Sequence, residues 1–420
     1  MPAPRDPAHA RLDEVVRTCR DRVVGATARW CGDGELAADA FGDAVLRAME
    51  RWSRDGVPDD PEAWLITATR NRIRDVLGSA AVRRGAVLEE AEDAVAADGA
   101  DPAGEAAPHL GHAAIDPALV VLFACADPAV EASVRAPLML QGVLEVPTEE
   151  VARAFGLSAD TLTKRISRAR RRMREARVDV AVPERLDEDR LPAVLEAIYA
   201  LSALDVAAPL LDDLAELRVD AAVHLSQLLL GAFPRDGEVR GLAALLLYLR
   251  SRVGARYEDG VLIPVSAQRV DRWDHALIDR AEQILRATAE HGSAGRFQIE
   301  AAIQSAHAAR RRGPVDWTAI AMLYEVLVAV APTRGAQVAR AVAIGRVAGP
   351  RPALEVLDAV APECGAFQPW HAARAHLLGL AGRDGEAIES YRRAIALSVS
   401  EPERRWLAAA CVELESPSAG

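Results

Sequence analysis

Between residues 148 and 176, apolar positions recur at helical spacing on both sides of a tight turn. Thr148 is the expected N-cap of a first helix, Gly156 ends that helix, and Ser158 is the expected N-cap of a second. The apolar side of the first helix consists of Val151, Ala154 and Phe155. The second has a stripe of the kind that faces a core, formed by Leu162, Ile166, Ala169 and Met173. The pattern predicts a helix-turn-helix.

The opposite face of the second helix is polar and strongly basic. It carries Lys164, Ser167, Arg168 and Arg171, and the stretch 153–177 holds nine basic residues against two acidic ones. A basic run of this kind is often only a solvated helix face. Beside a capped turn and a buried stripe, it instead indicates a helix that contacts the phosphates and base edges of DNA.

Charge divides the chain into segments. No lysine or arginine occurs between Arg84 and Arg135, whereas ten acidic residues do, and the centre of this stretch, 96–117, is rich in Ala, Gly, Pro and Asp. Such a composition buries too little apolar surface to order itself. The expected division is a helical block at 8–85, an acidic linker at 86–116 and a helix-turn-helix domain at 117–180.

The N-terminal block contains two amphipathic helices. The inward side of the first, 35–54, consists of Leu36, Ala40, Ala44 or Val45, Ala48 and Trp52. Its exposed face carries Asp39, Asp43 and Arg47, four residues apart. The second helix, 61–77, packs through Trp64, Leu65, Ala68, Ile73 and Val76 and exposes Arg70, Asn71 and Arg74. We expect Trp64 in the core, in preference to a role in stacking on bases.

The C-terminal half repeats itself. A shift of 34 residues pairs Ala341 with Ala375, Ile344 with Leu378, Ala348 with Gly382, Ala353 with Ala387, Leu357 with Tyr391 and Val360 with Ala394. This period is typical of tetratricopeptide-like helix pairs, which we expect within a helical extension at 190–415. Such an array binds a regulatory protein or a small molecule, or serves only as a scaffold. Because only Val261–Val265 resembles a strand, the predicted fold class is all-α.

Composition sets further limits. A chain of 420 residues, 50% hydrophobic and 27% charged, is expected to form about two to four soluble domains. Apolar runs are too short to span a bilayer and the first residues lack a signal core, so we expect a cytoplasmic protein without membrane contact. The net charge of −12 confines DNA contact to a local surface.

Chemistry beyond nucleic-acid binding has little support in the sequence. The five cysteines are scattered singly, which suggests neither a metal site nor disulfides. Phosphate-binding loops and the common hydrolase and metalloprotease motifs are absent. The histidines of the C-terminal half, such as His371 and His376, are interpreted as packing residues. We therefore assign no catalytic residue, metal or cofactor.

The order of these parts resembles a known family. The segments ELAADAFGDAVLRAM, PDDPEAWLITATRNRIRDVL and EEVARAFGLSADTLTKRISRARRRMR, separated by an acidic linker, are similar to an extracytoplasmic-function (ECF) sigma factor. The C-terminal half, with DRWDHALI, DWTAIAMLYEVLVAVAP and AGRDGEAIESYRRAIAL, resembles the subgroup that carries a tetratricopeptide-like extension. The resemblance covers nearly the whole chain and implies a region 2-like domain, a region 4-like helix-turn-helix domain and a helical extension.

The resemblance implies RNA polymerase core and promoter DNA as partners. It places polymerase binding on Asp39, Asp43 and Arg47. It places the minus-10 element at the DGVPDDP loop together with Arg70, Asn71 and Arg74. The minus-35 element falls to Thr163, Lys164, Arg165, Ser167 and Arg168, with Arg171 and Arg172 at phosphates. Regulation is implied to come from the extension in place of a separate anti-sigma factor.

The chain departs from the family pattern at several points. Gly42 stands where a glutamine usually precedes the acid of the clamp-binding helix, and glycine inside a helix costs up to about 1 kcal/mol. The extension lacks an Asn-Glu-Gly-Tyr signature, and CADP at 125–128 replaces Cys-Cys-His-Pro. Two alternatives to a working sigma factor follow: an adaptor that does not bind DNA, or recruitment to small-molecule binding or catalysis in a cavity against the C-terminal helices.

Overall fold

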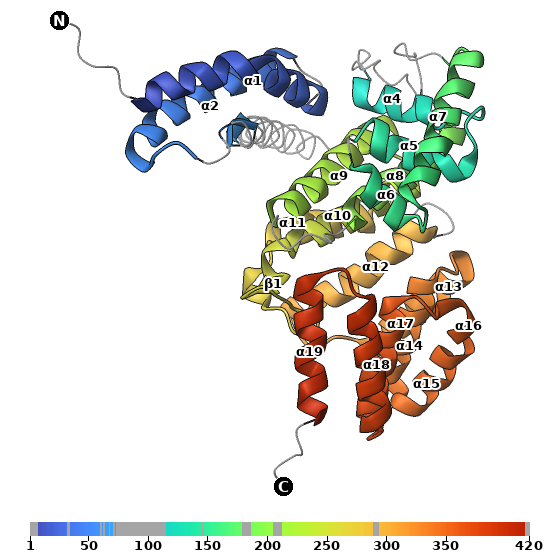
Figure 1. Cartoon of the computed structure of the whole chain (residues 1–420). Coiled ribbons are helices and arrows are strands. Elements are labelled where there is room, and N and C mark those ends of the chain that lie inside the picture. Colours follow the sequence, from blue (N-terminus) through green and yellow to red (C-terminus); the bar gives the residue numbers. More distant parts are fainter. Residues whose placement is uncertain are drawn as a thin grey trace, which may run out of the picture. The chain divides into compact units, whose positions relative to one another are not determined.

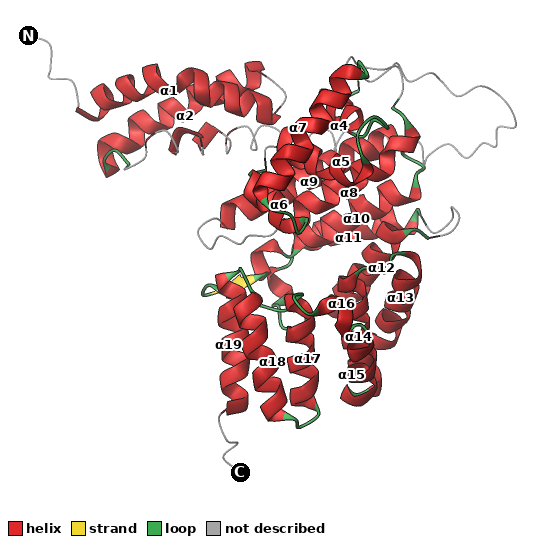
Figure 2. Ribbon diagram, turned by 45° about the vertical axis from the view of Figure 1, so that its right-hand side comes forward, coloured by secondary structure: helices red, strands yellow, loops and turns green. Residues whose placement is uncertain are grey.

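The protein is almost entirely helical (Figures 1 and 2). The computed structural model describes residues 7–31, 34–58, 61, 64–66, 68–69, 72, 115–144, 146–178, 186–204, 212–288 and 294–415. The chain divides into two compact units, 1–118 and 119–420. The all-α fold class predicted from the sequence is confirmed.

The smaller unit is built on two long helices, α1 (Pro7–Cys31) and α2 (Gly34–Asp55), which pack along each other. Its buried core consists of Leu12, Cys19, Val23, Phe41, Ala44, Ala48, Trp52 and Leu65. The rings of Trp52 and Trp64 meet edge to face with centroids 5.5 Å apart, so Trp64 packs as predicted. Ala40 is buried as well, whereas Ile73 and Val76 lie outside the described residues.

Four helices open the larger unit: α4 (Pro117–Cys125), α5 (Ala132–Gly142), α6 (Thr148–Ala154) and α7 (Ala159–Glu175). Helix α5 contacts both α6 and α7 and buries Val134, Leu138, Met139 and Leu140. The Arg170 guanidinium of α7 donates to the Gln141 amide oxygen of α5 at 2.8 Å. These contacts hold α6 and α7 at a fixed angle.

The middle of the larger unit is arranged around one helix that is apolar on every side. This helix, α10 (Gly237–Ser251), buries all of residues 241–248. Its neighbours are α8 (Leu191–Ala203), α9 (Asp212–Ala232), α11 (His275–Arg286) and α12 (Arg296–Ala308). A Cβ at Gly241 would lie closer than 3.0 Å to the backbone of Phe297 and Gln298, so glycine permits the close approach of α10 and α12.

A short hairpin connects α10 to α11. Strand β1 (Tyr257–Glu258) pairs antiparallel with β2 (Val261–Leu262). Asp259 and Gly260 both adopt positive φ, 50° and 73°, as the two central residues of a tight hairpin turn require. The strand expected at 261–265 is thus confirmed for its first two residues only. Three-residue 3-10 turns occur at Glu188–Arg190, Val253–Ala255, Val270–Arg272 and Ala309–Arg311.

The C-terminal part is a succession of packed helices: α13 (Trp317–Val330), α14 (Arg334–Ala348), α15 (Pro350–Ala359), α16 (Ala361–Cys364), α17 (Gln368–Leu380), α18 (Asp384–Leu397) and α19 (Glu401–Glu415). Helices α17, α18 and α19 lie side by side (Figures 1 and 2). Helix α19 also packs on the β-hairpin. None of the helices described is long and apolar enough to cross a membrane.

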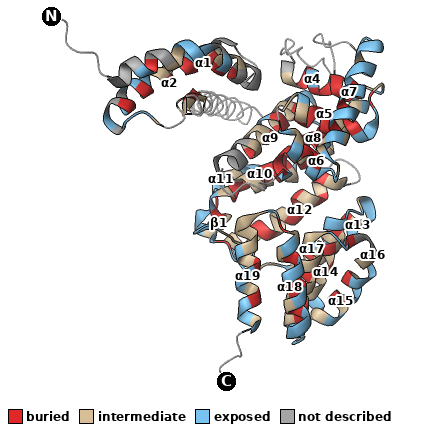
Figure 3. Cartoon of the chain, in the orientation of Figure 1, coloured by how far each residue is buried: buried red, intermediate tan, exposed pale blue. Residues whose placement is uncertain are grey.

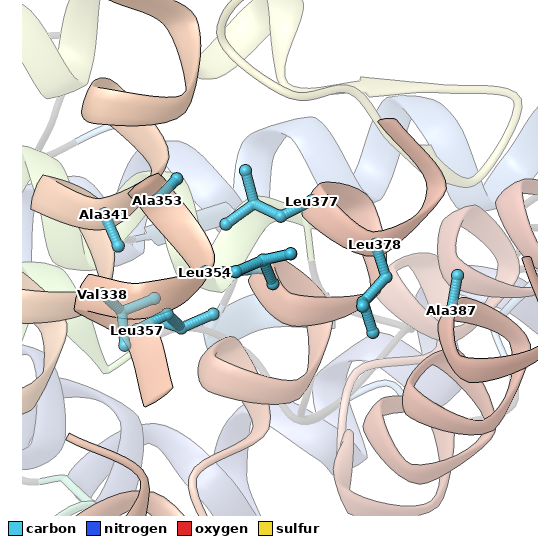
Figure 4. Packing of buried hydrophobic residues seen from close by; sticks show 9 residues of the cluster. Val338, Ala341, Ala353, Leu354, Leu357, Leu377, Leu378 and Ala387 are labelled. Atoms are coloured by element: carbon cyan, nitrogen blue, oxygen red, sulfur yellow. The ribbon is translucent and has the colours of Figure 1, made fainter. Parts of the chain in front are cut away.

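The positions paired by the 34-residue shift occupy corresponding places. Ala341 and Ala375 are fully buried, and so are Ala353 and Ala387. Figure 4 shows Val338, Ala341, Ala353, Leu354 and Leu357 on one side of the junction between the two copies and Leu377 and Leu378 on the other, with Ala387 beyond Leu378 on the next helix. Each copy is therefore a helix pair whose small residues are buried where helices pack closely. Its assignment to the tetratricopeptide-like class stays a prediction.

Candidate nucleic-acid interface

The turn between α6 and α7 has a defined hydrogen-bonded form. Gly156 has a φ of 65°, the Leu157 amide donates to the Ala152 carbonyl at 2.8 Å, and the Gly156 amide donates to the Arg153 carbonyl at 3.1 Å. These two bonds define a Schellman C-cap, which favours glycine because of its left-handed residue. The Ser158 hydroxyl then accepts from the Thr161 amide at 3.2 Å. The predicted end of the first helix at Gly156 and the predicted N-cap of the second at Ser158 are both confirmed.

The first helix differs from its prediction in two respects. Helix α6 already includes Thr148, and Pro147 stands at the N-cap without any side-chain cap bond, so the predicted Thr148 cap is wrong. The apolar side is formed by Val151 and Ala152. Ala154 is exposed, and Phe155 leaves the helix at its C-cap with 37% of its surface exposed. The left-handed turn at Gly156 redirects the chain before Phe155 can face the core.

Helix α7 follows its predicted pattern closely. Leu162, Ile166 and Ala169 are buried and Met173 is half-buried. The opposite side is open to solvent (Figure 3). The exposed residues of the predicted reading face are Thr163, Lys164, Ser167, Arg168, Arg171 and Arg172, and Arg165 is half-buried. All seven candidate residues on this helix therefore remain within reach of a ligand; we call these seven the basic face.

Local pairs on the basic face are weak. Lys164 Nζ lies 3.4 Å from the Asp160 carboxylate, and Arg171 Nε lies 3.5 Å from that of Glu175. Pairs of this kind between exposed side chains four residues apart on a helix contribute about 0.3 to 0.5 kcal/mol and are screened by salt. Phosphate groups compete easily with such partners, so both cations are available to a polyanion.

Glu131, which the sequence patterns did not single out, belongs to the surroundings of the basic face. Its pKa is lowered by a hydrogen bond from the Ser133 hydroxyl, 2.6 Å away, and by the positive charges of Arg165, Arg172 and Arg168. This exposed carboxylate at the N-terminus of α5 therefore sits in the field of the basic face. Its charge opposes the approach of a polyanion from that side.

The helix-turn-helix domain contacts the extension at several points, of which the following two ion pairs and one ring contact are here called the joint. Arg218 of α9 pairs with Glu150 of α6 at 2.7 Å. Arg190 pairs with Asp127 at 2.8 Å. The rings of Phe123 and Phe233 stack at 5.9 Å with an interplanar angle of 18°. Helix α8 also packs on α5, so the predicted separation at 180–190 coincides with an extensive contact; the domain limits themselves stay predictions.

In the smaller unit, the predicted polymerase-binding residues lie on α2. Asp39 and Arg47 are exposed, and the half-buried Asp43 pairs with Arg72 Nε at 2.5 Å. Gly42 is exposed, with open space around the position of a Cβ. The predicted minus-10 residues, Arg70, Asn71 and Arg74, lie outside the described residues, as does most of the predicted acidic linker.

Metal-binding groups are absent from the described part of the chain, where no cluster of three His, Cys, Asp or Glu side chains occurs. Cys19, Cys125, Cys364 and Cys411 are buried thiols. Burial raises the pKa of Cys125 to about 11, against a smaller opposing effect of Arg170. Such a thiol stays protonated and unreactive at neutral pH.

Comparison with known proteins defines the class. Residues 15–84 match the family Sigma-70 region 2, and residues 190–289 match a family of unknown function, DUF6596. Uncharacterized protein R00370 of Rhizobium meliloti (strain 1021) is 33% identical over 405 residues, which cover 94% of each chain. The chain belongs to the same family as this rhizobial protein, and its N-terminal part carries a Sigma-70 region 2 domain. Region 2 implies RNA polymerase core as its partner.

Proposed function

We propose that the protein is an ECF-type sigma factor that directs promoter-specific transcription initiation. The observation that carries this proposal is the basic face of α7, which is presented on a capped helix-turn-helix and stays exposed although the extension packs nearby. In this role Thr163, Lys164, Arg165, Ser167 and Arg168 contact base edges of the minus-35 element. Arg171 and Arg172 hold phosphates, which position the helix without reading sequence.

The smaller unit supplies the remaining contacts in this proposal. Asp39, Asp43 and Arg47 lie on α2 and bind the polymerase clamp. The ion pair between Asp43 and Arg72 fixes the Asp43 carboxylate on this surface. Arg70, Asn71 and Arg74, which follow in the sequence, hold single-stranded DNA of the minus-10 element.

Regulation by the extension acts, in this proposal, through the joint. The pair Glu150–Arg218 connects α6 to α9, and the pair Asp127–Arg190 connects the turn after α4 to the 3-10 turn before α8. The described part of the extension leaves the basic face exposed, which supports an action through the joint in preference to steric blocking of α7. A change of the extension on binding a regulatory protein or small molecule instead reorients α6 and α7 relative to the smaller unit's DNA site.

In vitro transcription tests this function directly. Core polymerase with the full chain, on a library of promoter fragments, is expected to yield transcripts from templates that share minus-35 and minus-10 sequences. The matched control replaces Lys164 and Arg168 by alanine, which leaves the buried stripe of α7 intact. Transcription that is absent with the full chain, or equally strong and equally selective with the control, would contradict the proposal.

A second experiment addresses the role of the extension. Arg218→Ala removes the Glu150 pair from the joint without touching the basic face. If the extension regulates through the joint, this variant keeps its affinity for minus-35 duplex but changes the yield of promoter-dependent transcription. Equal yields from the variant and the native chain would mean that the joint carries no regulation.

A further inference from the structure

Arg252 carries a buried guanidinium group whose positive charge has no opposite charge beside it among the described residues. It follows α10 directly and is only 7% exposed. Its Nη2 donates to the Gln304 side-chain oxygen of α12, whereas its Nη1 has no hydrogen-bond partner. Among the described residues no carboxylate forms an ion pair with it. Taking a charge out of water without an opposite charge costs several kcal/mol.

The neighbouring Arg310 adds a second positive charge, and the nearby His307 is neutral, so neither of them neutralises Arg252. The Arg252 guanidinium lies 6.0 Å from the ring centre of Trp273, and that of Arg310 lies 5.5 Å from the same ring. His307 of α12 is 9% exposed and its Nδ1 also has no partner. Burial, followed by the charges of Arg252 and Arg310, lowers the pKa of His307 to about 4. The contact with Trp273, at the outer limit of the range for a cation–π interaction, does not replace an opposite charge for Arg252.

A row of ring contacts leads from His307 to an exposed arginine. The His307 and Trp317 rings meet edge to face with centroids 5.5 Å apart. The Arg346 guanidinium lies 5.1 Å from the centroid of the same Trp317 ring. Arg346 is exposed, and its charge, after burial, lowers the pKa of the half-buried His376. We call the following residues the cationic cluster: Arg252, His307, Arg310, Arg346 and His376, with Trp273 and Trp317.

Arg310 shows what a satisfied arginine in this region looks like. Its two terminal nitrogens donate to the carbonyl oxygens of Val265, at 2.5 Å, and Gln268, at 3.0 Å. Arg310 therefore has a structural task in holding the segment after the hairpin. Arg252 Nη1 and His307 Nδ1 make no comparable hydrogen bond. Buried polar groups without partners are rare enough to require an explanation.

We propose that the cationic cluster binds a small organic anion through a carboxylate or phosphate group, which accepts hydrogen bonds from Arg252 Nη1 and His307. Trp317 and Arg346 contact the remainder of the ligand at the solvent side. Such an anion supplies the negative charge and the hydrogen-bond acceptors that Arg252 and His307 lack among the described residues. The planar guanidinium group suits the geometry of carboxylate and of phosphate. A macromolecule is disfavoured because Arg252 is almost inaccessible from outside. The proposal does not depend on promoter recognition.

Anion-dependent stabilisation of the full chain is the test. Thermal unfolding is followed in sodium phosphate and, separately, in sodium citrate, with sodium chloride at matched ionic strength as reference; binding is then measured by calorimetry. We expect a saturable rise in melting temperature beyond that in chloride for at least one anion. The stronger of the two identifies the group as phosphate or carboxylate. The absence of a saturable response to both would overturn the proposal.

Variants locate the site. Arg252→Met keeps the volume but removes the charge and is expected to weaken binding at least tenfold. Arg392→Met, at an exposed position of α18, is the matched control and should bind like the native chain. Equal losses, or none, in the two variants would refute the assignment.

A second variant covers the case that Arg252→Met fails to fold. Arg346→Gln changes an exposed side chain on α14 and is expected to weaken anion binding about threefold or more without lowering the melting temperature in chloride. Unchanged binding would place the anion elsewhere. An oligoglutamate peptide that binds more tightly than either small anion would show that the cluster recognises an acidic protein segment and would also overturn the proposal.

Discussion

Two groups of cations in the larger unit differ in almost every physical respect. The basic face of α7 is contiguous in sequence, exposed and only loosely paired. The cationic cluster draws single residues from distant segments and buries Arg252 and His307 beside tryptophan rings. The first arrangement suits a long polyanion that approaches from solvent. The second suits a compact anion that is largely withdrawn from water.

The difference shows how burial determines what a positive charge can recognise. Exposed arginines give little energy each and act together, so their effect depends strongly on salt. A buried arginine interacts strongly with a single partner and strongly disfavours having none. The two regions therefore should respond differently to mutation, pH and salt.

The largest expected effect is a loss of stability from a substitution in the helices that carry the cationic cluster, with DNA binding unchanged. Gly241→Ala places a Cβ against the backbone of Phe297 and Gln298 and must push α12 away from α10. We expect a loss of about 3 kcal/mol in the free energy of unfolding, at the upper end for overpacking. Urea denaturation measures it, and binding of minus-35 duplex by the folded variant should stay unchanged.

The matched control is Gly231→Ala on α9, where the position of the Cβ is open. It should be neutral or stabilise by up to about 1 kcal/mol, because alanine is the better helix former. If both substitutions destabilised equally, the close approach of α10 and α12 would not be the cause. Loss of DNA binding in folded Gly241→Ala would show that the two cationic regions are not separable.

The next effect is a dependence of the unfolding free energy on pH, caused by His307. Its pKa is lowered from 6.5 to about 4, first by burial and then by Arg252 and Arg310, so the unfolded chain binds more protons than the folded chain between these values. The stabilisation from neutral His307 is therefore complete above pH 6.5 and is lost as pH falls toward 4. The lost amount is about 3 kcal/mol.

Comparison with His307→Phe isolates this contribution. Unfolding free energies at pH 7 and pH 4 should differ less in the variant than in the native chain by that amount, because phenylalanine keeps the contact with Trp317 without a titrating group. Parallel pH profiles for the two proteins would mean that His307 is not held neutral by its surroundings.

A smaller effect is expected on the basic face. Lys164→Ala and Arg168→Ala should each weaken binding to a cognate minus-35 duplex by about 1 to 3 kcal/mol, the usual value of a good base contact. Binding to random duplex should change less. Fluorescence anisotropy at fixed salt measures both, and equal losses on both duplexes would contradict base reading by these side chains.

The smallest effect concerns a phosphate contact. Arg171→Ala should weaken binding to all duplexes alike and reduce the slope of log affinity against log salt by about 1. Salt titrations of the native chain and the variant measure the slope. A loss confined to the cognate duplex would move Arg171 among the base-reading residues, and an unchanged slope would remove it from the interface.

The sequence predicted the turn between α6 and α7 and the pattern of α7 well because their signals are local. Ser158 and Gly156 act through hydrogen bonds with residues at most four positions away, and the stripe of α7 depends only on helical period. Thr148 and Phe155 were misplaced because a shift of one residue at a helix end changes which side chain caps and which faces inward. Helix ends are where local patterns discriminate least.

The cationic cluster could not be predicted in the same way. Arg252, His307 and Arg346 come from separate segments, and only tertiary packing brings them near Trp273 and Trp317. One signal was available: residues 241–249 are apolar on all sides of the helix, which indicates a helix buried all round. Arg252 follows this run by three residues and is buried with it, so its guanidinium group needs an anionic or hydrogen-bonding partner.

The joint has a consequence for concentration. Glu150–Arg218 and Asp127–Arg190 tie the helix-turn-helix domain to the extension, so in the proposed function whatever the extension binds is carried to the promoter with it. In that proposed role, a ligand or protein bound to the extension would meet the transcription complex as an intramolecular neighbour, at an effective concentration that short connections raise to the millimolar range. Even a weak association with the extension would then be felt at the one promoter where the reader is bound.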